Sequence, residues 1–136
     1  MNSLLAIIGS VLVGLAALVH VYIFVMESVQ WTKPATWKRF GVRSQADADV
    51  TKPMAFNQGF YNLFLAIGVA TGLILLASGV PQVGLGMIFL AAGSMVAAAL
   101  VLVVSSPKLA RAAAIQGTLP LLGLIFLVAS LIVSSP

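Results

Sequence analysis

Long unbroken runs of apolar residues dominate the chain, and short polar stretches separate them. The runs cover about residues 4–26, 54–77, 83–104 and 109–133. A bilayer core about 30 Å thick needs roughly 20 apolar residues in a helix that rises about 1.5 Å per residue. Each run meets that length, and its apolar residues do not alternate with polar ones as in a barrel strand. The pattern therefore predicts four transmembrane helices.

The connections between the last three runs are short. Residues 78–82 and 105–108 leave room only for tight turns, so consecutive helices run antiparallel. We therefore expect an all-α fold, in which residues 1–136 form one integral membrane domain built as an antiparallel four-helix bundle. Residues 28–53 form the one sizeable loop.

All basic residues fall in this loop or next to the third connection. They are Lys33, Lys38, Arg39, Arg43, Lys52, Lys108 and Arg111. Loops rich in lysine and arginine stay on the cytoplasmic side of a membrane. Both basic segments are therefore predicted to be cytoplasmic and both termini non-cytoplasmic, which fits a multi-pass protein of a cell membrane, the bacterial inner membrane in our interpretation.

The composition supports this picture and excludes several functions. Only 7% of the residues are charged and 61% are hydrophobic, whereas a soluble domain carries roughly 25% charged residues. The chain has no cysteine and a single histidine, so we expect no disulfide, no thiol chemistry and no metal site. The net charge of +4 is explained by topology, so nucleic acid is not an expected partner.

The basic loop also carries Trp31, Trp37 and Phe40. Aromatic and cationic side chains together suit the lipid headgroup layer, and we expect the loop to attract anionic lipids. Residues 35–40 are predicted to form a short helix that ends at Gly41, and Ser44 with Asp47 to cap a further turn. A functional lid or a phosphate clamp is the alternative interpretation of the loop.

Small residues recur at a spacing of four along three of the predicted helices, which is typical of helix packing in membranes. They are Ala6, Ser10 and Gly14, then Gly68 and Gly72, then Gly93 and Ala97. Packing within the chain and packing between copies in a homo-oligomer both fit this spacing.

Ionisable groups inside a membrane helix are costly, so each is a candidate functional group. His20 and Glu27 lie seven residues apart and so share one helix stripe with Trp31. Glu27 sits at the cytoplasmic end of its helix, and His20 lies about 10 Å deeper. We predict His20 and Glu27 as catalytic residues, acting as proton donor and acceptor.

The second and fourth helices carry further polar residues in the same leaflet. The predicted substrate-binding residues are Trp31, Asn57, Gln58, Tyr61, Asn62 and Gln116. Gly59 would let another backbone or a ligand approach closely, and Pro120 frees the carbonyl of Gln116. We expect these groups to form a pocket among helices one, two and four, open to the cytoplasm or the inner leaflet. Hydrogen bonds between helices, with Glu27 as an interfacial acid, are the simpler alternative.

Three functions fit such a pocket. The first is binding of a small lipophilic molecule, with isomerisation or conjugation as an accompanying reaction, so whether the chain is an enzyme stays open. The second is a small proton-coupled exporter, and the third an accessory subunit of a membrane complex. No cofactor is predicted from the residues themselves.

The motifs H-x6-E-x3-W from His20, N-Q-G-x-Y-N from Asn57 and Q-G-x-x-P from Gln116 resemble the bacterial family named domain of unknown function 1304. The resemblance covers nearly the whole chain and implies a small four-span bacterial membrane protein. A looser resemblance links the chain to the MAPEG membrane enzymes, which would imply glutathione as a ligand. Asn57 matches that family's asparagine, whereas Tyr61 and Asn62 stand where it carries a glutamate.

Overall fold

A computed structural model describes residues 1–133 and contains four helices long and apolar enough to cross a membrane. Helix α1 (Ser3–Phe24) continues into a π-helical turn, η1 (Val25–Val29). Helices α3 (Gln45–Ala77) and α4 (Pro81–Ser105) follow, and a short turn, η3 (Pro107–Leu109), precedes α5 (Ala110–Ile132). The predicted all-α membrane fold is confirmed.

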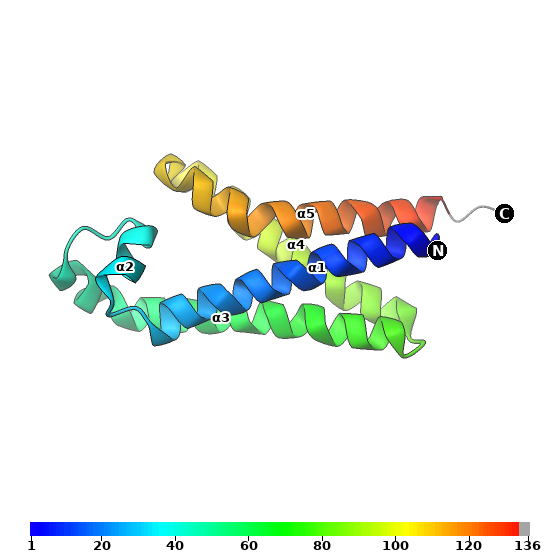
Figure 1. The fold of residues 1–136 in the computed structure, drawn as a ribbon, viewed down its shortest axis with the longest axis horizontal. Helices are drawn as coiled ribbons and strands as arrows, with labels where there is room; N and C mark the ends of the chain where they lie inside the picture. The colour runs from blue at the N-terminus through cyan, green and yellow to red at the C-terminus, as the bar shows by residue number, and fades with distance from the viewer. Residues whose placement is uncertain (134–136) are drawn as a thin grey trace.

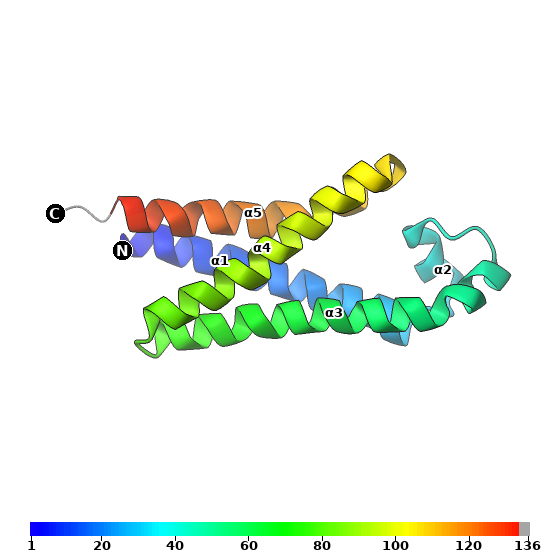
Figure 2. The same ribbon diagram turned by 180° about the vertical axis from the view of Figure 1, so that it is seen from behind.

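The four long helices close into a ring in which α1 packs against α3 and α5, and α4 packs against the same two helices. Helix α1 lies between α5 and α3 in one view (Figure 1), and α4 crosses diagonally over the opposite side (Figure 2). The start of α1 lies beside the end of α5, where the backbone N–H of Asn2 donates to the carbonyl of Ser130 at 2.8 Å.

The end of the bundle farthest from the N-terminus carries the short helix α2 (Pro34–Trp37) and the α4–α5 turn (Figure 1). Because all seven basic residues lie there, we call it the basic end. The side of the membrane that it faces stays a prediction.

Glycines set the closest contacts between helices. A Cβ atom on Gly84 of α4 would lie 2.7 Å from the carbonyl oxygen of Gly72 on α3. On the other side of the ring, a Cβ atom on Gly123 of α5 would lie 3.0 Å from the backbone nitrogen of Val13 on α1. Backbones that approach this closely gain van der Waals contact, which is the main attraction between helices in lipid.

The predicted small-residue faces are therefore only partly used within the chain. Gly72 packs as expected, and Gly68 lies close to Ala91. A Cβ atom on Gly93 would meet nothing within 4 Å, and Ala97 is exposed. The third helix instead packs through Gly84, because the diagonal course of α4 turns the Gly93 face outward.

The basic loop folds into a small cap with its own core. Helix α2 continues into a 3-10 turn, η2 (Lys38–Phe40), and ends at Gly41, whose φ of 80° suits glycine. Trp31 and Trp37 pack with Ala48 and Ala55 in this core. The short helix that was predicted for residues 35–40 is present.

The second long helix differs from the sequence prediction, because α3 begins at Gln45 instead of near residue 54. Ser44 caps its start, with its hydroxyl accepting from the backbone N–H of Asp47 at 3.1 Å. Pro53 lies inside the helix. The carbonyl deprived of a donor by Pro53 belongs to Asp49, an exposed residue, so the helix continues through the proline.

Candidate functional site

A buried carboxyl group lies where α1 meets α3. Glu27 belongs to η1, in which the backbone N–H of Gln30 bonds the carbonyl of Val25, five residues back. Such π-helical turns are rare and are frequently found at functional sites. The Glu27 side chain is only 7% exposed, and its Oε2 accepts a hydrogen bond of 2.9 Å from Nδ2 of Asn62.

Two backbones pass closely beside this pair. A Cβ atom on Gly59 would meet the Ser28 hydroxyl, and would lie 3.1 Å from the Cβ of Glu27 and 3.2 Å from the carbonyl of Phe24. The Ser28 hydroxyl donates to the carbonyl of Phe56 at 2.8 Å. The absence of a side chain at Gly59 thus allows the backbone at the end of the first helix to approach α3. Of the two expected neighbours of Gly59, a backbone or a ligand, the structure shows the backbone.

The single histidine lies deeper in the bundle. His20 is 2% exposed, and its Nδ1 lies 2.9 Å from the carbonyl oxygen of Ala16. A carbonyl can only accept, so Nδ1 carries the hydrogen, and Nε2 of the neutral ring is an acceptor. Seven residues of helix, about 10 Å, separate His20 from Glu27.

The packing register places Gln116 at the depth of His20. Val13 of α1 contacts Gly123 of α5, and the two helices run antiparallel. Seven residues onward from Val13 is His20, and seven residues back from Gly123 is Gln116. Gln116 also shares a helix stripe with Gly123, so its half-buried side chain lies on the side of α5 that faces α1.

Three polar atoms of this region have no hydrogen-bond partner within residues 1–133. They are Nε2 of His20, Oε1 of Glu27 and Oδ1 of Asn62. In the same part of the chain, no fully enclosed side-chain nitrogen or oxygen lacks a partner. Each of the three atoms must therefore reach a small accessible surface, although its residue is buried.

Other predicted site residues lie apart from this pair. Asn57 and Gln58 are exposed on α3, although the backbone carbonyl of Gln58 accepts from Asn62 at 3.1 Å. Tyr61 is 55% exposed. Trp31 lies in the core of the cap, where its Nε1 donates to the carbonyl of Ala48 at 2.9 Å. The predicted site residues thus fall into three groups. Glu27 and Asn62 are hydrogen-bonded, His20 and Gln116 lie at one depth on neighbouring helices, and the remaining residues lie apart from both.

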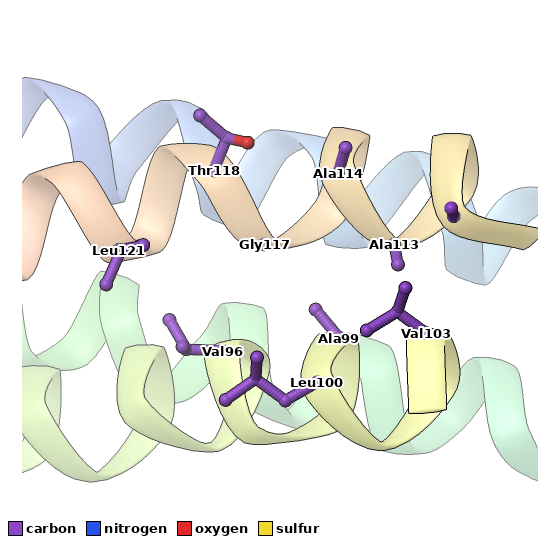
Figure 3. Close-up of a pocket in the computed structure, with 10 residues that line it drawn as sticks. Val96, Ala99, Leu100, Val103, Ala113, Ala114, Gly117, Thr118 and Leu121 are labelled. Carbon is purple, nitrogen blue, oxygen red and sulfur yellow. The ribbon is translucent and has the colours of Figure 1, made fainter. Parts of the chain in front are cut away.

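Two hollows open on the bundle surface, and both are mainly apolar. One, of about 240 Å³, lies between α4 and α5 and is lined by small side chains such as Ala99, Ala113 and Gly117 (Figure 3). Thr118 also borders it, but its side chain points away from α4 (Figure 3). The other, of about 340 Å³, lies between α3 and α4 beside Tyr61. His20 and Glu27 line neither hollow.

Two features of the site escaped sequence reasoning. The first is Ser28, whose hydroxyl binds the α3 backbone. Its position next to Glu27, with a small side chain that can face Gly59, is the sequence feature that could have identified it. The π-helical turn has no comparable sequence signal. Among the described residues, no group of three or more His, Cys, Asp or Glu side chains could hold a metal ion.

Comparison with known proteins places the chain in a family. No curated protein and no solved structure matches it. The family model described as protein of unknown function (DUF1304) matches residues 14–128. That range contains His20, Glu27, Asn62 and Gln116 and covers most of the four-helix core. The chain is a member of the DUF1304 family.

Proposed function

We propose that this protein binds a small lipophilic molecule inside the membrane and holds its polar group at Glu27 and Asn62. The observation that carries the proposal is a carboxyl group in a membrane helix whose one hydrogen bond within residues 1–133 comes from a neighbouring helix. Buried ionisable groups in membrane helices usually serve a ligand or proton path. The accessible Oε1 of Glu27 leaves one oxygen for that role.

Isomerisation is the reaction that best suits the two ionisable groups. His20 would take a proton at Nε2 and Glu27 would return one, or the reverse, as general acid and base. The spacing of about 10 Å requires an extended substrate that lies along α1 and reaches both groups. Conjugation is the alternative reaction and needs a second substrate.

Co-purification tests the binding proposal directly. Wild-type protein, Glu27→Leu, Asn62→Leu and the control Asp49→Asn are purified from the same membranes, extracted with organic solvent and compared by mass spectrometry. Asp49 is exposed, and within residues 1–133 its side chain bonds only Gln45. We expect a molecule retained by wild type and by Asp49→Asn but lost from both other variants. Identical extracts from all four proteins would contradict the proposal.

The basic end is proposed to bind anionic lipid headgroups. Within residues 1–133, no lysine or arginine forms an ion pair with a carboxylate. The three carboxyl side chains there bond polar neighbours instead: Asp47 bonds Ser44, Asp49 bonds Gln45 and Glu27 bonds Asn62. Lys108 and Arg111 stand next to the cap, because Leu109 lies 3.7 Å from the Cβ position of Gly41. Each cation near an anionic surface contributes roughly 1 kcal/mol.

Charge removal at the basic end should therefore weaken lipid selectivity. Arg43→Gln combined with Lys108→Gln is expected to lower retention of phosphatidylglycerol relative to phosphatidylcholine, as measured by native mass spectrometry. The apolar variant Val104→Leu, near the same end, is the control. Equal retention of both lipids by wild type and by the charge variant would refute this part of the proposal.

The predicted orientation is testable because the chain has no cysteine. Single cysteines at Arg43 and Gln82, both exposed, report on opposite ends of the bundle. In intact bacterial cells, a membrane-impermeant maleimide should label Gln82→Cys and should label Arg43→Cys only after lysis. The reverse pattern would place the basic end outside the cell.

A further inference from the structure

We infer that the ligand of the Glu27–Asn62 site is a lipophilic primary ammonium ion. This inference rests on the proposed function and names the chemical class of the molecule. It follows from the hydrogen-bonding capacity that the protein leaves unused, from the charge balance around Glu27 and from the aromatic rings beside it.

When Glu27 is ionised, every unused polar atom of the site is an acceptor. The Asn62 amide has two N–H groups, and both are engaged, one with Oε2 of Glu27 and one with the carbonyl of Gln58. Both of these partners are acceptors, so the nitrogen and not the oxygen must face them. What remains at the site is Oδ1 of Asn62 and Oε1 of Glu27. A ligand that satisfies these atoms must donate hydrogen bonds, and an ammonium ion has three donors.

The charge balance favours a cation over a neutral donor. Within residues 1–133, no lysine or arginine pairs with Glu27, because all seven lie in the cap, at the start of α3 or near the α4–α5 turn. A buried carboxylate without a cationic partner is strongly disfavoured. An ammonium ion on the ligand supplies the missing charge, whereas a carboxylate ligand would meet repulsion at both Glu27 and Asn62 Oδ1.

The aromatic rings next to the pair suit the same ligand. Phe24 and Phe60 meet edge to face at 5.2 Å between ring centroids, and Phe56 lies 5.0 Å from Phe60. Phe24 precedes Glu27 by one helical turn, and Phe60 lies next to Gly59. Aromatic faces attract cations and also bury alkyl chains. The two helices thus offer an acceptor pair for the head of an amphiphilic amine and, within one or two turns of it along the chain, aromatic rings for its adjoining carbons.

A set of three isosteric probes separates this inference from the proposed function. Octylamine, octanol and octanoate are titrated into protein in phosphatidylcholine nanodiscs. The read-out is the ¹⁵N resonance of the single histidine together with the intrinsic tryptophan fluorescence. We expect saturable binding of octylamine, with affinity reduced about tenfold or more in Glu27→Gln and unchanged in Asp49→Asn. Asn62→Ser provides the same comparison if Glu27→Gln does not fold.

Each outcome has a defined meaning. Octanol or octanoate binding as tightly as octylamine, with the same dependence on Glu27, would overturn the ammonium inference and leave the proposed function standing. Octylamine binding that is equal in wild type and Glu27→Gln would overturn it as well. Saturable binding of none of the three probes would overturn both. A nanodisc series containing phosphatidylethanolamine identifies the source, because competition with octylamine would point to an aminophospholipid headgroup and its absence to a free amine.

Discussion

Replacing Gly84 by alanine is expected to destabilise the bundle by about 1–3 kcal/mol relative to the same change at Gly86. The added Cβ at position 84 would lie 2.7 Å from both the carbonyl oxygen of Gly72 and the backbone nitrogen of Leu76. These are backbone atoms, which cannot rotate away as a side chain can, so α3 and α4 must separate. The contact along the whole α3–α4 hairpin then weakens.

Gly86 is the matched control because it lies on the same helix and its added Cβ would meet nothing within 4 Å. Alanine there gains helix propensity, worth about 1 kcal/mol, without a clash. Both variants are compared with wild type by reversible unfolding in mixed detergent and SDS micelles, followed by circular dichroism. Equal stability of Gly84→Ala and Gly86→Ala would show that α3 and α4 do not pack through this glycine.

Replacing Asn62 by leucine is expected to cost about 1–3 kcal/mol of stability. The change leaves Oε2 of Glu27 without the donor that stands 2.9 Å away in the wild type. A buried polar group without a partner loses far more than the modest gain of an average hydrogen bond between membrane helices, about 0.6 kcal/mol. Glu27→Leu alone should be milder, because Asn62 keeps its bond to the carbonyl of Gln58.

The double variant Glu27→Leu/Asn62→Leu completes a thermodynamic cycle. We expect it to recover much of the stability lost in Asn62→Leu, because two apolar groups then replace a matched polar pair. Asn57→Leu, at an exposed position on the same helix, is the control and should be close to neutral. Strict additivity of the two single changes would mean that Glu27 and Asn62 do not interact.

The four long helices could be predicted from the sequence because hydrophobic length alone defines a membrane span. The loop was harder to predict. Its apolar residues are too few to signal a core, yet Trp31 and Trp37 build one with Ala48 and Ala55. The early start of α3 escaped prediction because Pro53 is usually a sign that a helix has ended.

The candidate site was predictable in part, for a physical reason. Glu27 and Asn62 stand out because polar groups are rare in membrane helices, and the structure joins them. Which polar residues of α3 face inward depends on how that helix is rotated about its axis against α1, and this rotation is set by the close contact at Gly59. The periodicity of an ideal helix therefore could not show that Asn57 and Gln58 face outward while Asn62 faces Glu27.

The proposed site depends on the state of one carboxyl group, that of Glu27, which is the only glutamate in the chain. Glutamate labelled with ¹³C at the side-chain carboxyl therefore gives a single infrared band that isotope editing can isolate. The wild-type band should differ from that of Asn62→Leu, and it should shift when octylamine is added, while Asn57→Leu should match the wild type. A band that resembles a water-exposed carboxyl and that neither Asn62→Leu nor octylamine alters would contradict the account.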